Sequence, residues 1–375
     1  MMLLGLVLHS AASYVVFPLG PAWPYKDPNT STLFDIMVFV IHLFRMPVFF
    51  VAAGFFAALL MERDGPRAFF LNRVKRVLIP LALFWPVLIS AIGIAFLYAA
   101  RRAGTTLDLP PDAFERRPGL GHLWFLWDLM IFYIVVVAAA PLASRIPSRW
   151  RDRIESTFAS IATTLGGALV LAIVTTITLL PMEGPALETS DALLPPIRIL
   201  VAYGVFFAFG WLLYWRRDLL VPFGARWKTT MAIGSLGAVA YLVLTVGQVI
   251  TDRVVFHVVG CALAGLTIWM LIFGIVGWFV SRLDRPRPLG RYLSDASYWM
   301  YLVHLPFTVA VPGLLAPLGM PAALKFAITL AVTTAVTLVT YHYLVRSTAI
   351  GVLLNGRRYP RSLPAREPSR ATVAV

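Results

Sequence analysis

Charged residues and cysteine are both scarce in this chain of 375 residues. Asp, Glu, Lys and Arg make up only 13% of it, about half of the ~25% that soluble domains carry. The single cysteine, Cys261, excludes a disulfide within the chain and a cysteine-based metal site. Walker, HExxH and GxSxG motifs are also missing, so phosphate-loop, zinc-protease and serine-hydrolase chemistry lack support. We expect no bound metal.

Acidic residues are the rarer kind of charge. The chain has 18 Asp and Glu against 32 Lys and Arg, for a net charge of +14. Such an excess can indicate a nucleic-acid partner. Here, however, the basic residues fall in short loops between apolar stretches, as the positive-inside rule describes for membrane proteins. We therefore expect the partner to be a lipid bilayer and not a nucleic acid.

Long apolar stretches dominate what is present, because 59% of the residues are hydrophobic. The stretches run for about 20 residues, which matches ~30 Å of hydrocarbon. Only helices satisfy every backbone group within one segment in lipid. The sequence therefore predicts an all-α, polytopic integral membrane protein with about ten transmembrane helices. We place them at 1–18, 36–60, 77–100, 122–144, 159–181, 196–215, 229–251, 257–281, 297–316 and 322–345.

Orientation and domain limits follow from the same loops. Most Lys and Arg follow the second, fourth, sixth and eighth spans or lie in the C-terminal tail. We assign that side to the cytoplasm, so both termini are expected there, in a bacterial inner membrane. The N-terminus lacks the basic start and cleavage motif of a signal peptide. Residues 1–346 form one predicted membrane domain, and residues 347–375 a basic, disordered cytoplasmic tail.

Ionisable side chains inside a span cost at least ~2.5–3.5 kcal/mol, so each one is a candidate for function. His9 lies ~12 Å along the first span. It could act as a general base on a hydroxyl, or it could be a histidine satisfied by a neighbouring helix. In the second span His42 and Arg45 share a face, and Asp35 lies on nearly the same face. Arg45 needs an anion, a wet cavity, or a salt bridge with Asp35 or Asp128.

The fourth span begins with His122 and Trp124, near the outer interface where aromatic residues are common. Asp128 lies ~9 Å deeper than His122. It could orient a catalytic histidine, pair with Arg45 or bind acceptor hydroxyls. The alternative is a partner in helix packing.

Two polar residues share a face of the ninth span, Tyr301 and His304. Both could contact a substrate. Alternatively, His304 is a packed histidine that bonds to a backbone carbonyl freed by Pro306.

A basic segment enters the third span from the predicted cytoplasmic side. Arg73 and Arg76 are one helical turn apart, with Lys75 between them. Such a pair could clamp phosphates. The alternative is ordinary positive-inside topology.

Five collinear stretches resemble the acyltransferase family 3 membrane proteins. Within that family the likeness is greatest to the succinyltransferases of osmoregulated periplasmic glucans. The stretches are MLLG (2–5) before His9, HLFRMPVFF (42–50) with GFF (54–56), RVKRVLIP (73–80), HLWFL (122–126), and the run from Ala296 to YLVHLP (301–306).

The resemblance implies that His9 is the catalytic residue and that Arg73 and Arg76 engage acyl-CoA at the cytoplasmic face. It also implies an arginine eleven residues before that histidine. The position would precede Met1, so either the true start codon lies upstream, as we expect, or this protein lacks that arginine. The implied donor is succinyl-CoA or acetyl-CoA, and Lys75 is expected to help to hold its phosphates.

The hypothesis is therefore a membrane-bound O-acyltransferase whose acceptor is a hydroxyl of a periplasmic or surface glycan, such as an osmoregulated periplasmic glucan. His9 would remove the hydroxyl proton, and Asp128 or Asp35 would orient the His9 ring. Arg45, His42 or Tyr301 would stabilise the oxyanion. The candidate substrate-binding residues are Asp35, His122, Trp124, Tyr301 and His304.

Two other functions fit the composition. A transporter or flippase for a glycan or anionic substrate would use the same polar residues to line a path, but the sequence has no inverted repeat. A non-catalytic scaffold gives no reason for Arg45 inside a span. Neither the acyl group nor the oligomeric state is indicated by the sequence.

Overall fold

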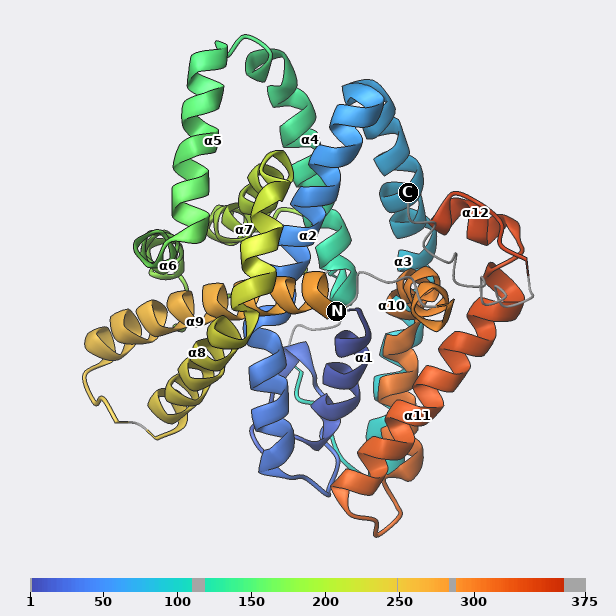
Figure 1. The fold of residues 1–375 in the computed structure, drawn as a ribbon. Helices are drawn as coiled ribbons and strands as arrows, with labels where there is room; N and C mark the ends of the chain where they lie inside the picture. Colours follow the sequence, from blue (N-terminus) through green and yellow to red (C-terminus); the bar gives the residue numbers. More distant parts are fainter. Residues whose placement is uncertain (1, 110–118, 248, 283–287, 361–375) are drawn as a thin grey trace, which may run out of the picture.

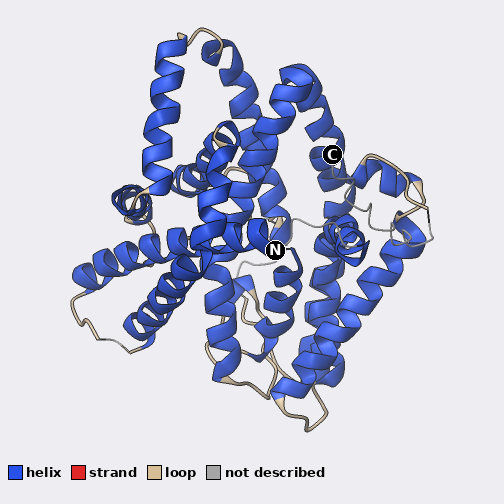
Figure 2. Cartoon of the chain, in the orientation of Figure 1, coloured by secondary structure: helices blue, strands red, loops and turns tan. Residues whose placement is uncertain are grey.

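The computed structural model describes residues 2–109, 119–247, 249–282 and 288–360. Every regular element in these ranges is helical, which agrees with the predicted fold class (Figure 2). The α-helices are α1 Met2–Ala11, α2 Thr32–Arg73, α3 Ile79–Ala103, α4 Trp124–Ala143, α5 Ser148–Thr163, α6 Leu165–Leu179, α7 Ile197–Trp215, α8 Leu220–Val246, α9 Arg253–Arg282, α10 Pro288–Leu315, α11 Ala322–Thr340 and α12 Ala349–Asn355 (Figure 1).

Seven helical segments of the described chain are long and apolar enough to cross a membrane. The longest, Thr32–Ala103, has 72 residues and would measure ~108 Å if straight, several times the hydrocarbon thickness. Gly65 breaks it with a φ of 79°, and the chain turns back there, so that α2 and α3 run in opposite directions (Figure 1). The segment therefore contains two of the predicted spans. The predicted total of ten is not confirmed, and the side on which the termini lie stays a prediction.

The first predicted span, 1–18, is wrong in length. Its helix is α1, continued by a 3-10 turn to Tyr14, and these 13 residues cover only ~20 Å. Prolines at 18, 21 and 24 explain the early end, because proline removes the donors that a helix needs. Residues 15–31 instead form a folded connection to α2, which we call the strap. Its Trp23 and Tyr25 are buried.

The predicted span 159–181 is divided in the structure. Residues Ser148–Thr163 and Gly166–Leu179 meet at 97°, and the bent pair would be an eighth crossing if it counts as one span. Thr164 takes an extended conformation at the break, and its side chain accepts a hydrogen bond from the Gly167 amide, which caps α6.

Helices α2 and α7 pack backbone to backbone through small residues. A Cβ at Gly54 would run into the carbonyl of Phe207, and one at Gly210 into the carbonyl of Val51. Small residues allow such close approach in membrane proteins. On the other side of the bundle α10 packs against α1, α3 and α11. The first helix is thus held between α2 and α10 (Figure 1).

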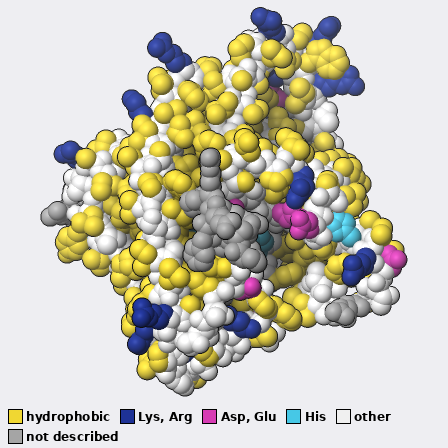
Figure 3. Space-filling model, turned by 180° about the vertical axis from the view of Figure 1, so that it is seen from behind, with side chains coloured by type: hydrophobic (Ala, Val, Ile, Leu, Met, Phe, Trp, Pro, Cys, Tyr) yellow, Lys and Arg dark blue, Asp and Glu magenta, His cyan; other side chains and the backbone are white. Residues whose placement is uncertain are grey.

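Large apolar side chains cover the outside. Val87, Ile94 and Leu236 are 65%, 67% and 71% exposed, an arrangement that needs a lipid surrounding. Figure 3 shows hydrophobic side chains over most of one face, with Lys and Arg side chains mainly at its rims. These features fit a multi-pass membrane protein.

The prediction of disorder from residue 347 is wrong for the first part of the tail. Helix α12 follows Arg346, which is 2% exposed and donates from Nε to the Pro360 carbonyl at 2.8 Å. The Tyr359 hydroxyl donates to Asp295 at 2.9 Å. These contacts attach residues up to 360 to α10. The rest of the predicted tail, 361–375, lies outside the described residues.

Candidate active site

A small cavity lies where α1, α2, α4 and α10 meet. Its volume is about 50 Å³, room for a few water-sized groups. Six of the sequence candidates line it together with hydrophobic residues. The lining residues are Met2, Gly5, His9, Arg45, Met46, Phe49, His122, Trp124, Phe125, Tyr301 and His304.

Two histidines from opposite ends of the chain are hydrogen-bonded beside this cavity. His9 Nδ1 and His304 Nε2 are 2.7 Å apart, and their rings stack with centroids at 5.0 Å. His304 Nδ1 lies 2.7 Å from the carbonyl oxygen of Tyr301. A carbonyl only accepts, so His304 Nδ1 donates to it and, in a neutral ring, His304 Nε2 is an acceptor. His9 Nδ1 must then donate to His304.

This chain of hydrogen bonds fixes the tautomer of His9. Since Nδ1 carries the proton, Nε2 of the neutral ring carries a lone pair. None of the described residues hydrogen-bonds to that Nε2, and His9 is only half-buried at the cavity. A histidine oriented through one nitrogen with the other free has the arrangement of a general base.

Pro306 also shapes the site, but not through His304 as the sequence suggested. Proline lacks an N–H, so the carbonyl four residues earlier, that of Leu302, loses its helical donor. His122 Nε2 donates a hydrogen bond to this carbonyl at 3.0 Å. His122 Nε2 therefore carries a proton, and its buried Nδ1 has no hydrogen-bond partner among the described residues.

Tyr301 positions His122. Its hydroxyl donates to the His122 carbonyl at 2.7 Å, which joins the start of α4 to α10. Because the Tyr301 hydroxyl proton is already donated to this carbonyl, the structure does not favour Tyr301 as a donor to the oxyanion. Trp124 is two residues after His122, and its ring lies 5.5 Å from that of Tyr203.

Arg45 is the unpaired cation of the cavity. Gly5 of α1 leaves room for it, because a Cβ there would lie 3.1 Å from Arg45 Nη1. Its buried Nε has no hydrogen-bond partner, and no described carboxylate lies within ion-pair distance. The proposed salt bridges with Asp35 and Asp128 are therefore wrong. A guanidinium stays charged, so Arg45 calls for an anion from outside the described chain.

The two candidate acids lie elsewhere. Asp35 accepts hydrogen bonds from the amides of Val16 and Phe17 at 2.9 and 3.0 Å, and it lies ~15 Å along α2 from Arg45. It fastens the strap. Asp128 is fully buried, both of its oxygens lack a partner among the described residues, and it does not line the cavity. His304, not an acid, orients His9.

His42 is half-buried one turn before Arg45 and does not line the cavity. Its predicted catalytic contact is therefore not formed. The described residues also contain no group of three or more His, Cys, Asp or Glu that could hold a metal ion.

Sequence reasoning missed Trp23. Its ring is nearly parallel to that of His9, with an angle of 9° and centroids at 5.8 Å. Its indole N–H donates to Ser13 Oγ at 3.0 Å. His9 thus has Trp23 and His304 as stacked neighbours. No local pattern marks this contact, since the strap was read as part of a membrane span and a loop.

Lys75 and Arg76 lie in a π-helical turn, Val74–Leu78, and Arg73 directly precedes it. The Arg73 guanidinium lies over the rings of Phe69 and Tyr133 at 5.7 and 5.8 Å, and its buried Nε has no partner among the described residues. Lys75 is exposed, and Arg76 is half-buried. Arg73 Nη2 donates to Asn72 Oδ1 at 2.6 Å, so the guanidinium is only partly satisfied, and its remaining donors fit a ligand with phosphates.

None of these three cations lines the cavity, but α10 touches both places. Tyr298 donates to the Arg76 carbonyl at 3.0 Å, while His304 binds His9. Tyr298 and His304 are six residues apart, or ~9 Å along the helix axis. The basic turn and the histidine pair are therefore neighbours along one helix.

A free imidazole nitrogen and an unpaired guanidinium at one cavity are the groups that a membrane-embedded group-transfer enzyme would use. Comparison with known proteins makes the assignment definite. Residues 2–342 match the acyltransferase domain of acyltransferase family 3, and the chain belongs to that family. It is a membrane acyltransferase, as the motifs indicated.

Relatives of this chain are glucans biosynthesis proteins C. Those of Salmonella paratyphi A and Salmonella agona are 24% identical over 390 residues, which covers 100% of this chain and 95% of theirs. That of Salmonella typhimurium is 25% identical over 395 residues with the same coverage. No solved structure matches the chain.

Proposed function

We propose that this protein is an O-acyltransferase that moves a succinyl or acetyl group from acyl-CoA, bound at the cytoplasmic side of the inner membrane, to a hydroxyl of a periplasmic or surface glycan. The observation that carries the proposal is the chain of hydrogen bonds from the Tyr301 carbonyl through His304 to His9. It leaves one imidazole nitrogen free beside a cavity that contains an unpaired arginine.

The proton steps follow from this arrangement. His9 Nε2 accepts the proton of the acceptor hydroxyl while its oxygen forms the new bond to the acyl carbon. The C–S bond then breaks, and His9 returns the proton to the departing thiolate. The products are an ester and free coenzyme A thiol. His304 holds the His9 ring in the productive tautomer throughout, as a positioning residue.

Arg45 completes the reaction by stabilising negative charge. The carbonyl oxygen becomes an oxyanion as the hydroxyl attacks, and a positioned cation in a dry cavity stabilises it strongly. Arg45 has no competing carboxylate, so it is free for this role. A succinyl donor would bring a second anionic group to the same cation.

The donor is assigned to the basic turn. Arg73 and Arg76, with Lys75 at the surface, supply the positive charge that the phosphates of coenzyme A need. The acceptor is assigned from the relatives, whose printed name connects them with glucan biosynthesis. A periplasmic glucan is therefore the first acceptor to examine.

The test compares His9→Ala with His257→Ala in a strain that lacks the native gene. His257 bonds to the Leu180 carbonyl and does not line the cavity. We expect mass spectrometry of periplasmic and surface glycans to show acylation in the native and His257→Ala strains and none in the His9→Ala strain, at equal membrane levels. Unchanged glycan acylation in the deletion strain, or full activity of His9→Ala, would overturn the proposal.

A further inference from the structure

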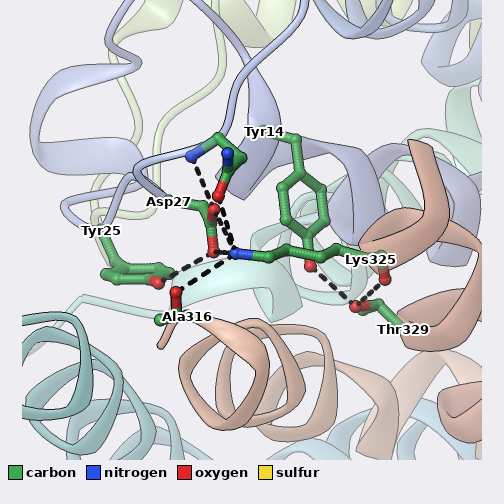
Figure 4. Close-up of polar contacts among 7 residues, drawn as sticks. Tyr14, Tyr25, Asp27, Ala316, Lys325 and Thr329 are labelled. Carbon is green, nitrogen blue, oxygen red and sulfur yellow. Dashed lines mark hydrogen bonds and ion pairs between the residues drawn. The ribbon is translucent and has the colours of Figure 1, made fainter. Parts of the chain in front are cut away.

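A second polar cluster, fully buried, lies between the strap and α11. The side chains of Lys325 and Asp27 are both 0% exposed, and Lys325 Nζ lies 2.9 and 3.2 Å from the two carboxylate oxygens. The same ammonium donates to Asn29 Oδ1 at 3.1 Å and to the Ala316 carbonyl at 3.3 Å (Figure 4). One side chain therefore joins the strap, the end of α10 and the start of α11.

The cluster also reaches the end of the first helix. The Tyr14 hydroxyl and Thr329 Oγ1 are 3.0 Å apart, and Thr329 donates to the Lys325 carbonyl at 2.8 Å (Figure 4). The backbone amide of Asn29 donates to Asp27 Oδ1 at 2.8 Å. Tyr14, which directly precedes the strap, and Asp27 and Asn29 within it are thus tied to α11.

Stability alone does not explain this ion pair. A buried pair gives little more than apolar residues of the same size would, because both charges lose their hydration. A pair of this kind instead favours one arrangement, since each charge is satisfied only when its partner is in place. If the strap moved away, Lys325 would keep only the Ala316 carbonyl. The pair therefore strongly favours the closed strap.

The closed strap acts on the candidate active site in two short steps. The Asp27 amide donates to the Ser13 carbonyl at 2.8 Å, and Ser13 Oγ accepts from the indole of Trp23 at 3.0 Å. Trp23 is 6% exposed and stacks on His9. The position of Asp27 therefore sets the position of the ring that covers His9.

We propose that Lys325 and Asp27 are positioning residues that hold Trp23 over His9 and so keep water away from the acyl donor. This inference rests on the proposed acyltransferase function. Water competes with the acceptor for the same carbonyl carbon: its oxygen would form the new bond, the C–S bond would break, and a free acid and coenzyme A thiol would result. Excluding water protects the thioester from this loss.

The test measures how the donor is divided between transfer and hydrolysis. Purified protein in lipid nanodiscs is given succinyl-CoA or acetyl-CoA with glucose oligosaccharides of both anomeric linkages. Released thiol reports total turnover, and mass spectrometry of the sugar reports transfer. We expect the ratio of hydrolysis to transfer to rise about tenfold in Lys325→Met, less than the ~100-fold that a misplaced reacting group can cost.

Two further variants separate positioning from loss of folding. Asn29→Ala removes one acceptor of Lys325 without leaving a charge unpaired, and we expect a smaller rise in the same ratio. Lys26→Met removes the exposed neighbouring ammonium, which bonds to the Val16 carbonyl at 2.5 Å, and we expect the native ratio. The ratio does not depend on the amount of folded enzyme, so a general loss of stability would not change it.

The contacts of Lys325 with Asp27 and Asn29 form a clasp on the strap, and hydrogen exchange tests this clasp without measuring activity. The amides of Trp23, Asp27 and Ser31 are bonded to the Gly20, Ser13 and Tyr14 carbonyls, and we expect all three to exchange faster in Lys325→Met and Asn29→Ala than in Lys26→Met. Native exchange in both variants, or a native ratio with normal transfer, would overturn the inference. A native enzyme that transfers to no sugar would instead remove the proposed function, while the exchange result would still decide whether the clasp exists.

Discussion

Lys325 and Arg45 are two cations of the helical bundle, and their surroundings are opposite. Lys325 has a carboxylate and two further oxygens as acceptors, whereas Arg45 has an unpartnered Nε and no described carboxylate within ion-pair distance. A satisfied buried charge fixes structure, and an unsatisfied one is available for chemistry. The contrast explains why the first holds the strap while the second lines the cavity.

The largest effect is expected where the satisfied cation is removed. Lys325→Met should lower the free energy of unfolding by about 3–5 kcal/mol, because Asp27 is left buried without a partner. Denaturant titration in mixed micelles measures this. The double variant Lys325→Met/Asp27→Leu should recover most of the lost stability. A double variant as unstable as Lys325→Met would show that the unpaired Asp27 charge is not the cause of the loss.

Removing Arg45 should have the opposite effect, a loss of activity without a loss of stability. Arg45→Met should reduce kcat for acyl transfer by about 100- to 1,000-fold, the size expected for loss of an oxyanion donor. Its thermal stability should equal or exceed that of the native protein, because a guanidinium whose buried Nε has no partner is lost. A stable Arg45→Met enzyme with native kcat would break the comparison between the two cations.

The imidazole pair should respond through kcat. His304→Ala removes the acceptor that fixes the His9 tautomer, and we expect kcat to fall by about 10- to 100-fold with little change in KM. Steady-state kinetics with varied acyl-CoA measures both. A change confined to KM would mean that His304 contacts the donor instead of orienting His9.

The smallest effect is expected at the strap's outer fastening. Asp35→Asn weakens its bonds to two backbone amides and should cost about 1 kcal/mol of stability without changing kcat. Plotting the change in kcat against the change in unfolding free energy for these variants then sharpens the comparison between the two cations. A large fall in kcat for Asp35→Asn would instead support the predicted catalytic role of Asp35.

The sequence was sufficient to find the polar residues of the site, but not their partners. His9, Arg45 and His304 stand out because ionisable side chains are costly inside apolar spans. Which of them meet depends on packing between segments 295 residues apart. Asp35 and Asp128 were the natural partners by charge, yet a second imidazole binds His9, because α10 and not α4 packs against α1.

The strap and its clasp escaped prediction for physical reasons. The apolar run that begins the chain looks long enough to cross a membrane, but prolines end the helix early. Lys325 stands at the start of an apolar span, where basic residues commonly set topology. Nothing near it in the sequence reveals that Asp27 fills the space beside it.

The most direct measurement is the protonation pattern of His9. Solid-state nitrogen-15 NMR of histidine-labelled protein in lipid distinguishes the two ring nitrogens, and the signal of His9 among the six histidines is identified by its loss in His9→Ala. We predict a neutral ring with its proton on Nδ1 and a free Nε2, and a different pattern in His304→Ala. A ring that is protonated on Nε2, or one that is unaffected by the loss of His304, would contradict it.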